Sequence, residues 1–178
     1  MAEVHGDYLS PEFIPLAHRG GALLPVNLGI ENTLRAFANA IDLGYTYLET
    51  DVHATKDGQL VAFHDDDLSR VTDIVGRIRD FLFDDLGEFK VGDREPIPTM
   101  SELLDSFPEA RFNIDLKHPN AITPLVDVIR KHKAERRVCV GSFSRSTIHR
   151  FRSLLPEVPT AVSITGVAAM TMGAMSPG

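Results

Sequence analysis

Four short apolar runs constrain the fold most, because each of them ends in a group of ionisable residues. Residues 13–17 precede His18-Arg19, residues 45–48 precede Glu49-Thr50-Asp51, residues 60–63 precede His64-Asp65, and residues 111–114 precede Asp115-Leu116-Lys117. If the runs are parallel strands of one sheet, their carboxyl ends meet at one edge. Two imidazoles, three carboxylates and two cations then arrive at the same place, which is typical of a metal-assisted phosphoester site.

The regions between these runs have the spacing of amphipathic helices. Apolar residues recur every three or four positions up to Gly44, after Thr99 or Ser101, over residues 122–132 and over residues 144–155. Strands are predicted at residues 13–17, 45–52, 59–64, 112–116, 136–143 and 159–165, with an Asp57-Gly58 turn between the second and the third. This alternation predicts an α/β fold with a parallel sheet and right-handed crossovers.

The position of the polar residues favours a barrel over an open sheet. Alternate residues of a strand share a face, so Glu49 and Asp51 point the same way, as do Asp115 and Lys117. Polar groups on one face at strand ends fit the mouth of a TIM (β/α)8 barrel. A full barrel needs about 250 residues and has eight strands. We therefore expect residues 1–178 to form a single barrel domain of about six strands that is C-terminally incomplete, with the last one or two strands missing or divergent.

The composition limits the kinds of partner that this protein is expected to bind. A net charge of −7 and a pI near 5.4 argue against nucleic acid and against an anionic membrane surface. The single Cys139 excludes an intramolecular disulfide and is expected to be a buried, inert thiol. The first residues lack a secretory signal, and the uncharged stretch 158–178 is interrupted by Pro and Gly, so we expect a cytoplasmic protein without stable membrane insertion.

The ionisable groups divide into three chemical roles. Glu49, Asp51 and Asp115 would repel one another in a low-dielectric mouth, and a hard divalent cation such as Mg²⁺ or Ca²⁺ relieves that repulsion. His18 and His64 can exchange protons near neutral pH, whereas Arg19 and Lys117 can bind phosphate oxygens. The alternative is that the acids are solvated, the histidines structural and Lys117 a salt-bridge partner of Asp115. The other five histidines are expected to be surface or capping residues.

The pattern as a whole resembles the glycerophosphodiester phosphodiesterase family. The matching motifs, in order, are His18-Arg19-Gly20, Glu31-Asn32-Thr33, Glu49-x-Asp51, Asp57-Gly58, His64-Asp65, Arg70 with Thr72 and Gly76, Ile97-Pro98-Thr99, and Asn113-Ile114-Asp115-Leu116-Lys117. The resemblance implies a TIM barrel in which Glu49, Asp51 and Asp115 bind the metal. It also implies that His18 and His64 form the acid–base pair, that Arg19 and Lys117 bind phosphate, and that Glu31 lies near the metal shell.

Two departures from the family pattern stand out. The third metal position is frequently Glu in the family and is Asp115 here, which has a shorter reach. The family usually continues to a late strand that contains Trp, and this sequence has no Trp.

Three functions remain open from the sequence. The first is metal-dependent hydrolysis of a small glycerophosphodiester to an alcohol and glycerol 3-phosphate, within lipid and glycerol metabolism. The second is a related lipid phosphodiesterase of the sphingomyelinase D or phosphatidylinositol phospholipase type, which the mostly acidic or neutral loops at 20–30 and 65–98 disfavour. The third is a non-catalytic truncated barrel that binds phosphate or a partner, and in which a homo-oligomer would cover an open barrel edge.

Overall fold

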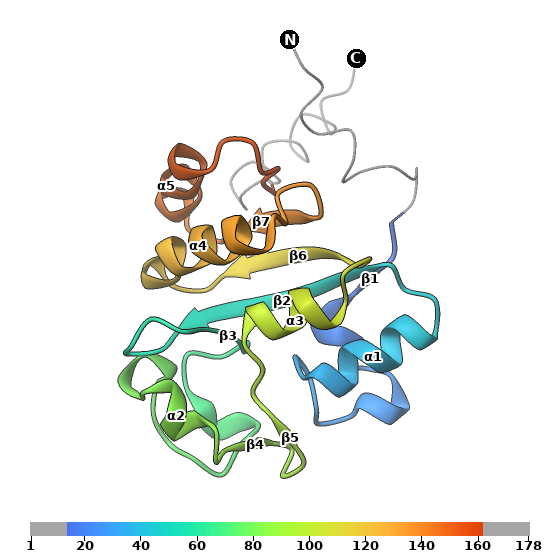
Figure 1. Ribbon diagram of the computed structural model, residues 1–178. Helices are drawn as coiled ribbons and strands as arrows, with labels where there is room; N and C mark the ends of the chain where they lie inside the picture. The colour runs from blue at the N-terminus through green and yellow to red at the C-terminus, as the bar shows by residue number, and fades with distance from the viewer. Residues whose placement is uncertain (1–13, 162–178) are drawn as a thin grey trace, which may run out of the picture.

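A curved sheet of parallel strands forms the centre of the protein. The computed structural model describes residues 14–161. Strands β1 (Leu16–Ala17), β2 (Tyr47–Ala54), β6 (Arg111–Leu116) and β7 (Val138–Gly141) pair in that spatial order, all parallel (Figure 1). A parallel bridge between Val140 and Thr160 starts the next position of the sheet. The fold is therefore an incomplete barrel of the (β/α) type, as the sequence predicted.

Four α-helices connect these strands. They are α1 (Leu34–Asp42), α3 (Met100–Ser106), α4 (Ile122–His132) and α5 (Arg145–Leu154). Thr33, Thr99 and Ser144 cap the starts of α1, α3 and α5, each accepting a hydrogen bond from a backbone N–H of the first turn. Helix α3 contacts α4, and α4 contacts α5, so the helices follow the curvature of the sheet. The predicted helices are all confirmed.

The main core lies between the sheet and these helices. Every residue of β2 is buried, whereas β6 alternates between buried and half-buried positions. The ring of Phe112 meets that of Phe37 edge to face, with centroids 6.1 Å apart. Asn113, Asp115 and the other half-buried position of β6 share one face of the strand. The core does not cover this face completely, so its side chains are available to the site.

One strand runs against the prediction. β3 (Leu60–Ala62) pairs antiparallel with β2 and not parallel, with Ala62 opposite Val52. The connection from β2 to β3 spans only residues 55–59, with Gly58 at φ +84°, and a parallel crossover needs a dozen or more residues. The Asp57-Gly58 turn therefore makes a hairpin.

This hairpin changes the count of barrel strands. Without β3, the described residues hold four parallel strands and the start of a fifth at Thr160, against eight in a complete barrel. With β3 included, the sheet has five strands and the start of a sixth, so the expected count of about six strands is confirmed. The predicted strand at 159–165 is described only up to residue 161, and the remainder of it, like residue 13 of the first strand, lies outside the described residues.

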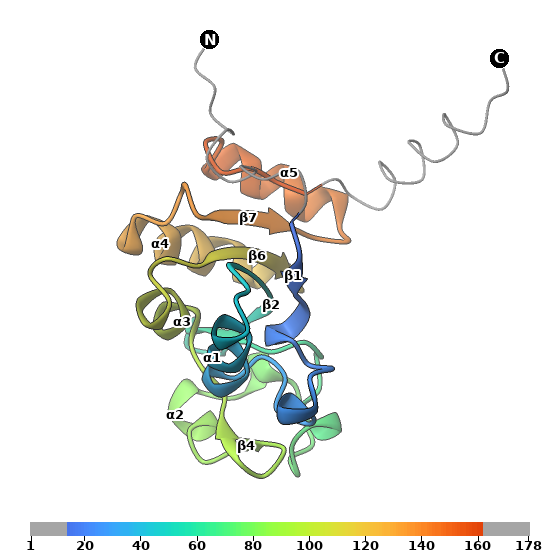
Figure 2. The same cartoon turned by 90° about the vertical axis from the view of Figure 1, so that its right-hand side faces the viewer.

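After β3 the chain leaves the sheet for a long irregular segment, residues 63–98, which we call the excursion. It contains η3 (Leu68–Arg70), η4 (Ile78–Asp80), α2 (Phe83–Leu86), β4 (Lys90–Val91) and β5 (Glu95–Pro96). It has its own small apolar cluster, made of Val61, Phe63, Leu68, Ile78, Leu86, Val91 and Ile97. Figures 1 and 2 show it as the part of the molecule farthest from α5.

Two further sequence predictions concern Cys139 and the absence of a membrane span. Cys139 is a free cysteine on β7 but is only partly buried, because the two valines beside it, Val138 and Val140, take the fully buried positions. Within residues 14–161, no helix combines the length and apolar character that a membrane span requires.

Candidate active site

The carboxylates of the site stand on adjacent strands. In the parallel pairing of β2 with β6, Asp51 lies beside Asp115 and Glu49 lies beside Asn113. Glu49 and Asp51 are buried, and only 2% of the surface of Asp51 is exposed. The strand periodicity thus brings the three predicted metal-binding carboxylates to one face, as expected.

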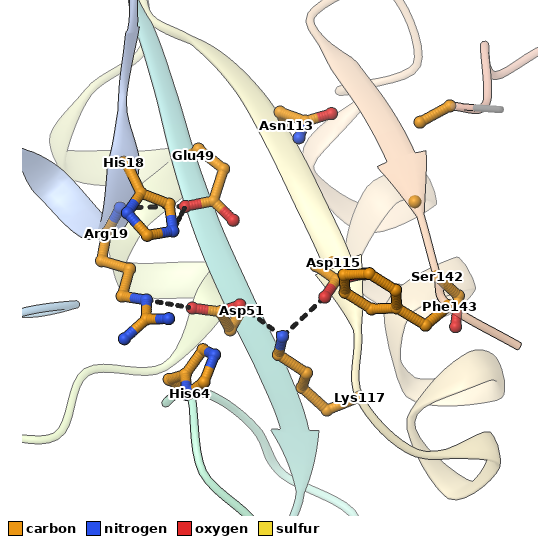
Figure 3. Close-up of a pocket in the computed structure, with 12 residues that line it drawn as sticks. His18, Arg19, Glu49, Asp51, His64, Asn113, Asp115, Lys117, Ser142 and Phe143 are labelled. Carbon is orange, nitrogen blue, oxygen red and sulfur yellow. Dashed lines mark hydrogen bonds and ion pairs between the residues drawn. The ribbon is translucent and has the colours of Figure 1, made fainter. Parts of the chain in front are cut away.

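Lys117 bridges two of these carboxylates. Its Nζ lies 2.9 Å from Asp51 Oδ1 and 2.7 Å from Asp115 Oδ2 (Figure 3). Burial lowers the pKa of Lys117, but the hydrogen bonds to Asp115 and Asp51 outweigh it and leave the pKa above its usual value. An ammonium group therefore occupies the position between two acids where a metal cation would neutralise them.

His18 and Arg19 are presented by a tight turn, η1 (His18–Gly20), at the end of β1. The backbone N–H of Arg19 donates to Glu49 Oε2 at 2.9 Å, and Arg19 holds a left-handed φ of 50°. A Cβ at Gly20 would lie 3.1 Å from the Cβ of Ala36, so the turn lies directly against α1. The chain therefore turns sharply directly after β1.

The two side chains of this turn point to the carboxylates. His18 Nε2 lies 3.8 Å from Glu49 Oε2, and the His18 side chain remains 63% exposed. Burial and the neighbouring Arg19 cation lower the pKa of His18, which favours the neutral imidazole. Arg19 Nη1 donates to Glu31 at 3.2 Å, while its buried Nε finds no hydrogen-bond partner within residues 14–161 and lies 3.7 Å from Asp51 Oδ2. That unpartnered donor fits an anion.

His64 reaches the same place by a different route. It follows the antiparallel β3, and the N–H of Phe63 donates to the carbonyl of Asp51 at 2.9 Å. The buried His53 ring lies within hydrogen-bond distance of the His64 carbonyl, Nε2 to O 3.2 Å. His64 is therefore attached to β2 through its backbone, and in Figure 3 its ring lies beside Asp51.

One cavity of about 290 Å³ collects these groups. All seven predicted site residues line it: His18, Arg19, Glu49, Asp51, His64, Asp115 and Lys117. Five further residues complete the lining: Asn113, Gly141, Ser142, Phe143 and Ala161. The convergence predicted from four strand ends is present, although one of the four strands runs the other way.

Some residues at the site had no predicted role. Asn32 is buried at φ 58°, donates to Asp51 Oδ2 at 3.1 Å and accepts from Thr50 Oγ1 at 2.9 Å, so it orients Asp51. Phe143 is 70% exposed and its ring centroid lies 5.6 Å from Lys117 Nζ. The Glu31-Asn32-Thr33 motif could have indicated Asn32 as a site residue. Nothing in the sequence near Phe143 indicated that it would lie at the site.

The donor set fits a hard divalent cation in its chemistry. Burial, reinforced by the charges of Asp51 and Asp115, raises the pKa of Glu49 to about 7, and a bound cation would favour its ionised form. The groups are oxygen donors, as Mg²⁺ and Ca²⁺ prefer. As they stand, however, no three acidic, His or Cys side chains within residues 14–161 are close enough to enclose an ion. Lys117, between Asp51 and Asp115, would have to move aside for a cation to take that position.

The loop after His18 differs from the sequence expectation. Residues 20–30 carry no charge, and Leu23, Val26 and Leu28 are 89%, 62% and 58% exposed. Asn27 anchors the loop from inside, donating to the carbonyls of Gly20 and Ala36. A second cavity of about 260 Å³, lined mostly by apolar residues of this loop and of β1, shares His18 with the first. The lack of charged residues in this loop therefore did not give it a polar surface.

Residues 18–176 match the model of the "Glycerophosphoryl diester phosphodiesterase family". The chain belongs to this family. The resemblance seen in eight short motifs is thus confirmed, and the match covers most of the chain.

Two curated proteins and one solved structure are similar to this chain. The "Probable glycerophosphodiester phosphodiesterase 2" of Mycobacterium tuberculosis is 37% identical over 153 residues, which are 86% of this chain and 57% of that protein. "Lysophospholipase D GDPD1" of Rattus norvegicus is 29% identical over 85% of this chain and 52% of its own length. The structure of an Oleispira antarctica phosphodiesterase in complex with the product sn-glycerol-3-phosphate is 27% identical with a TM-score of 0.76, covering 90% of this chain and 72% of that one. The chain thus spans little more than half the length of the two curated relatives.

Proposed function

We propose that this chain cleaves a glycerophosphodiester into an alcohol and glycerol 3-phosphate. The observation that carries the proposal is the convergence of two imidazoles, three carboxylates and two cations on one cavity in a member of this family. The product named in the Oleispira antarctica structure, sn-glycerol-3-phosphate, supports the same substrate class.

In this mechanism Arg19 and Lys117 bind the phosphate. The unpartnered Nε of Arg19 supplies a donor that needs an anion, and Lys117 would exchange a carboxylate for a phosphate oxygen. One imidazole of the His18 and His64 pair accepts the proton of the attacking hydroxyl, and the other donates a proton to the leaving alkoxide. If the hydroxyl belongs to the substrate's own glycerol, a cyclic phosphate forms, and water opens it with the two proton transfers reversed.

Glu49, Asp51 and Asp115 are the residues that would hold a divalent cation. When bound, Mg²⁺ or Ca²⁺ would supply positive charge against the phosphate oxygens. Asn32 and the backbone N–H of Arg19 orient Asp51 and Glu49 for this role through the hydrogen bonds described above.

The direct test is release of glycerol 3-phosphate from glycerophosphocholine and glycerophosphoethanolamine. We expect release in the presence of Mg²⁺ or Ca²⁺, loss of release in EDTA, and recovery when the cation is returned in excess. Turnover that survives complete chelation would refute the metal role. Absence of release from either substrate with both metals would refute the activity.

A lysophospholipid is the second candidate substrate. The exposed Leu23, Val26 and Leu28 and the apolar cavity beside His18 favour it, since an acyl chain on the glycerol would lie next to the phosphate. The relative from Rattus norvegicus that is named a lysophospholipase D supports the same class. Lysophosphatidylcholine below its micelle concentration should then be cleaved with a higher kcat/KM than glycerophosphocholine. Equal or lower values would favour the small substrate.

A further inference from the structure

Arg70, the last residue of η3, uses all three of its guanidinium nitrogens on two carboxylates. Its Nε donates to Asp65, while Nη1 and Nη2 donate to the two oxygens of Glu31 at 3.1 and 2.5 Å. Such a planar fork, with a hydrogen bond from each of its three nitrogens, is a geometry that lysine cannot reproduce. Arg70 does not line the active-site cavity, so it does not act on substrate directly.

The first of the two carboxylates holds His64. Asp65 Oδ1 lies 2.5 Å from His64 Nδ1. Partial burial raises the pKa of Asp65, but the hydrogen bonds from Arg70 and His64 outweigh it and keep the acid ionised. An ionised carboxylate only accepts hydrogen bonds, so His64 Nδ1 carries the proton of this bond. In the neutral ring, Nε2 is then left free to exchange a proton with substrate.

The second carboxylate holds Arg19. Glu31 Oε1 accepts from Arg19 Nη1 at 3.2 Å as well as from Arg70, and the backbone N–H of Arg19 in turn holds Glu49. The ion pairs therefore run from His64 through Asp65, Arg70 and Glu31 to Arg19. This series joins the excursion to the loop after β1, which the hydrogen bond from Arg94 Nη2 to the Leu28 carbonyl also links.

We propose that Arg70 is a positioning residue that fixes the His64 imidazole through Asp65 and, through Glu31, holds it at a set distance from Arg19. Without the guanidinium, Glu31 would keep only Arg19 as a cationic partner and Asp65 would have none, so Asp65 would turn away from the ring. The inference rests on the proposed function in that His64 is taken to exchange a proton with the substrate.

The same segment offers a matched control. Arg79 Nη1 donates to Asp66, the carboxylate next to Asp65, at 2.5 Å, and neither Arg79 nor Asp66 lines the cavity. Arg79→Ala therefore removes an ion pair of the same kind from the excursion without touching His64.

The experiment compares Arg70→Ala, Arg70→Lys, Asp65→Asn and Arg79→Ala in two measurements. The first is turnover of glycerophosphocholine with metal present. We expect kcat to fall about 10–100-fold for the first three variants, the range seen when groups that orient a functional residue are lost, with KM changed much less. Arg79→Ala should retain wild-type kcat. Millimolar guanidinium should partly restore Arg70→Ala but not Asp65→Asn.

The second measurement does not depend on activity. It is the ¹⁵N spectrum of the His64 ring at about pH 8, where an ordinary imidazole is neutral, assigned by its loss in His64→Gln. Wild type and Arg79→Ala should show one tautomer with the proton on Nδ1, and Arg70→Ala and Asp65→Asn should show a mixture.

The outcomes separate the two hypotheses. An unchanged His64 tautomer in Arg70→Ala, or an unchanged kcat in an active enzyme, would overturn the positioning role. A changed tautomer in a protein that cleaves none of the substrates would support the positioning role and refute the proposed function. If Arg70→Ala fails to fold, Arg70→Lys and Asp65→Asn decide between these outcomes by the same two measurements.

Discussion

The sheet and the excursion contribute different residues to the same site, and they hold these residues in place in different ways. Strands β2 and β6 present the three carboxylates by strand periodicity, on a face set by a large core, while His18 and Lys117 directly follow the ends of β1 and β6. The excursion presents His64, held by hydrogen bonds to β2 and by ion pairs through Asp65, and has only a small apolar cluster of its own. The half with the large core thus carries the three carboxylates, and the half with the small cluster carries His64, one of the two histidines proposed to transfer protons.

The largest expected effect comes from removing either histidine. His18→Ala, on the sheet side, and His64→Ala, on the excursion side, should each lower kcat about 10²–10⁴-fold, because each group transfers a proton. His149→Ala, an exposed histidine of α5, is the control and should keep full turnover. Release of glycerol 3-phosphate measures the loss, and circular dichroism checks the fold. If the variant of either site histidine kept a near wild-type kcat, that histidine would have no part in the proton transfers.

Removing the amide that orients Asp51 should have the next largest effect, on the sheet side alone. Asn32→Ala takes away the donor to Asp51 and the acceptor of Thr50. We expect metal affinity to fall about 10–100-fold, measured by calorimetric titration with Mg²⁺ or Ca²⁺. Asn39→Ala, which removes a donor to Asn27 but no hydrogen bond to Asp51, should leave the affinity unchanged. Equal affinities in Asn32→Ala and wild type would show that Asp51 needs no such support.

Two core substitutions test whether the halves are separate in stability. Leu125→Ala in α4 opens the main core and should lower the free energy of unfolding by about 2–5 kcal/mol while turnover of the folded fraction is kept. Ile78→Ala in the small cluster should speed amide exchange mainly in residues 63–98 and reduce kcat, since His64 depends on this segment. Hydrogen exchange and turnover are to be measured on both variants. Indistinguishable exchange patterns would mean that the two halves open as one unit.

The smallest effect concerns Cys139 in the sheet. Burial raises the pKa of its thiol to about 11 from a usual value of 9.0, so at pH 8 almost none of it is the reactive thiolate. A disulfide reagent should react slowly with the native protein at pH 8 and rapidly after unfolding. Since the folded thiol holds its proton more tightly, stability should decrease as the pH rises from about 9 to about 11, and Cys139→Ala should lack this decrease. Rapid native labelling at pH 8 would indicate that β7 opens locally.

Much of this protein follows from the sequence alone. The order of strands and helices, the caps at Thr33, Thr99 and Ser144, and the common face of Glu49 and Asp51 depend on residues close together in the chain. Local spacing and side-chain hydrogen bonds fix such features. For the same reason, all seven candidate site residues could be named before the fold was known.

Only the tertiary structure decided how these parts meet. The apolar pattern of β3 is the same for either strand direction, and the pairing with β2 shows that the strand runs antiparallel. The bridge of Lys117 between Asp51 and Asp115, the orientation of Asp51 by Asn32, and the ion pairs of Arg70 join residues up to 66 positions apart, Lys117 to Asp51 being the longest of these. No periodicity in a sequence encodes a contact of that kind, because it arises from packing two separately formed regions against each other.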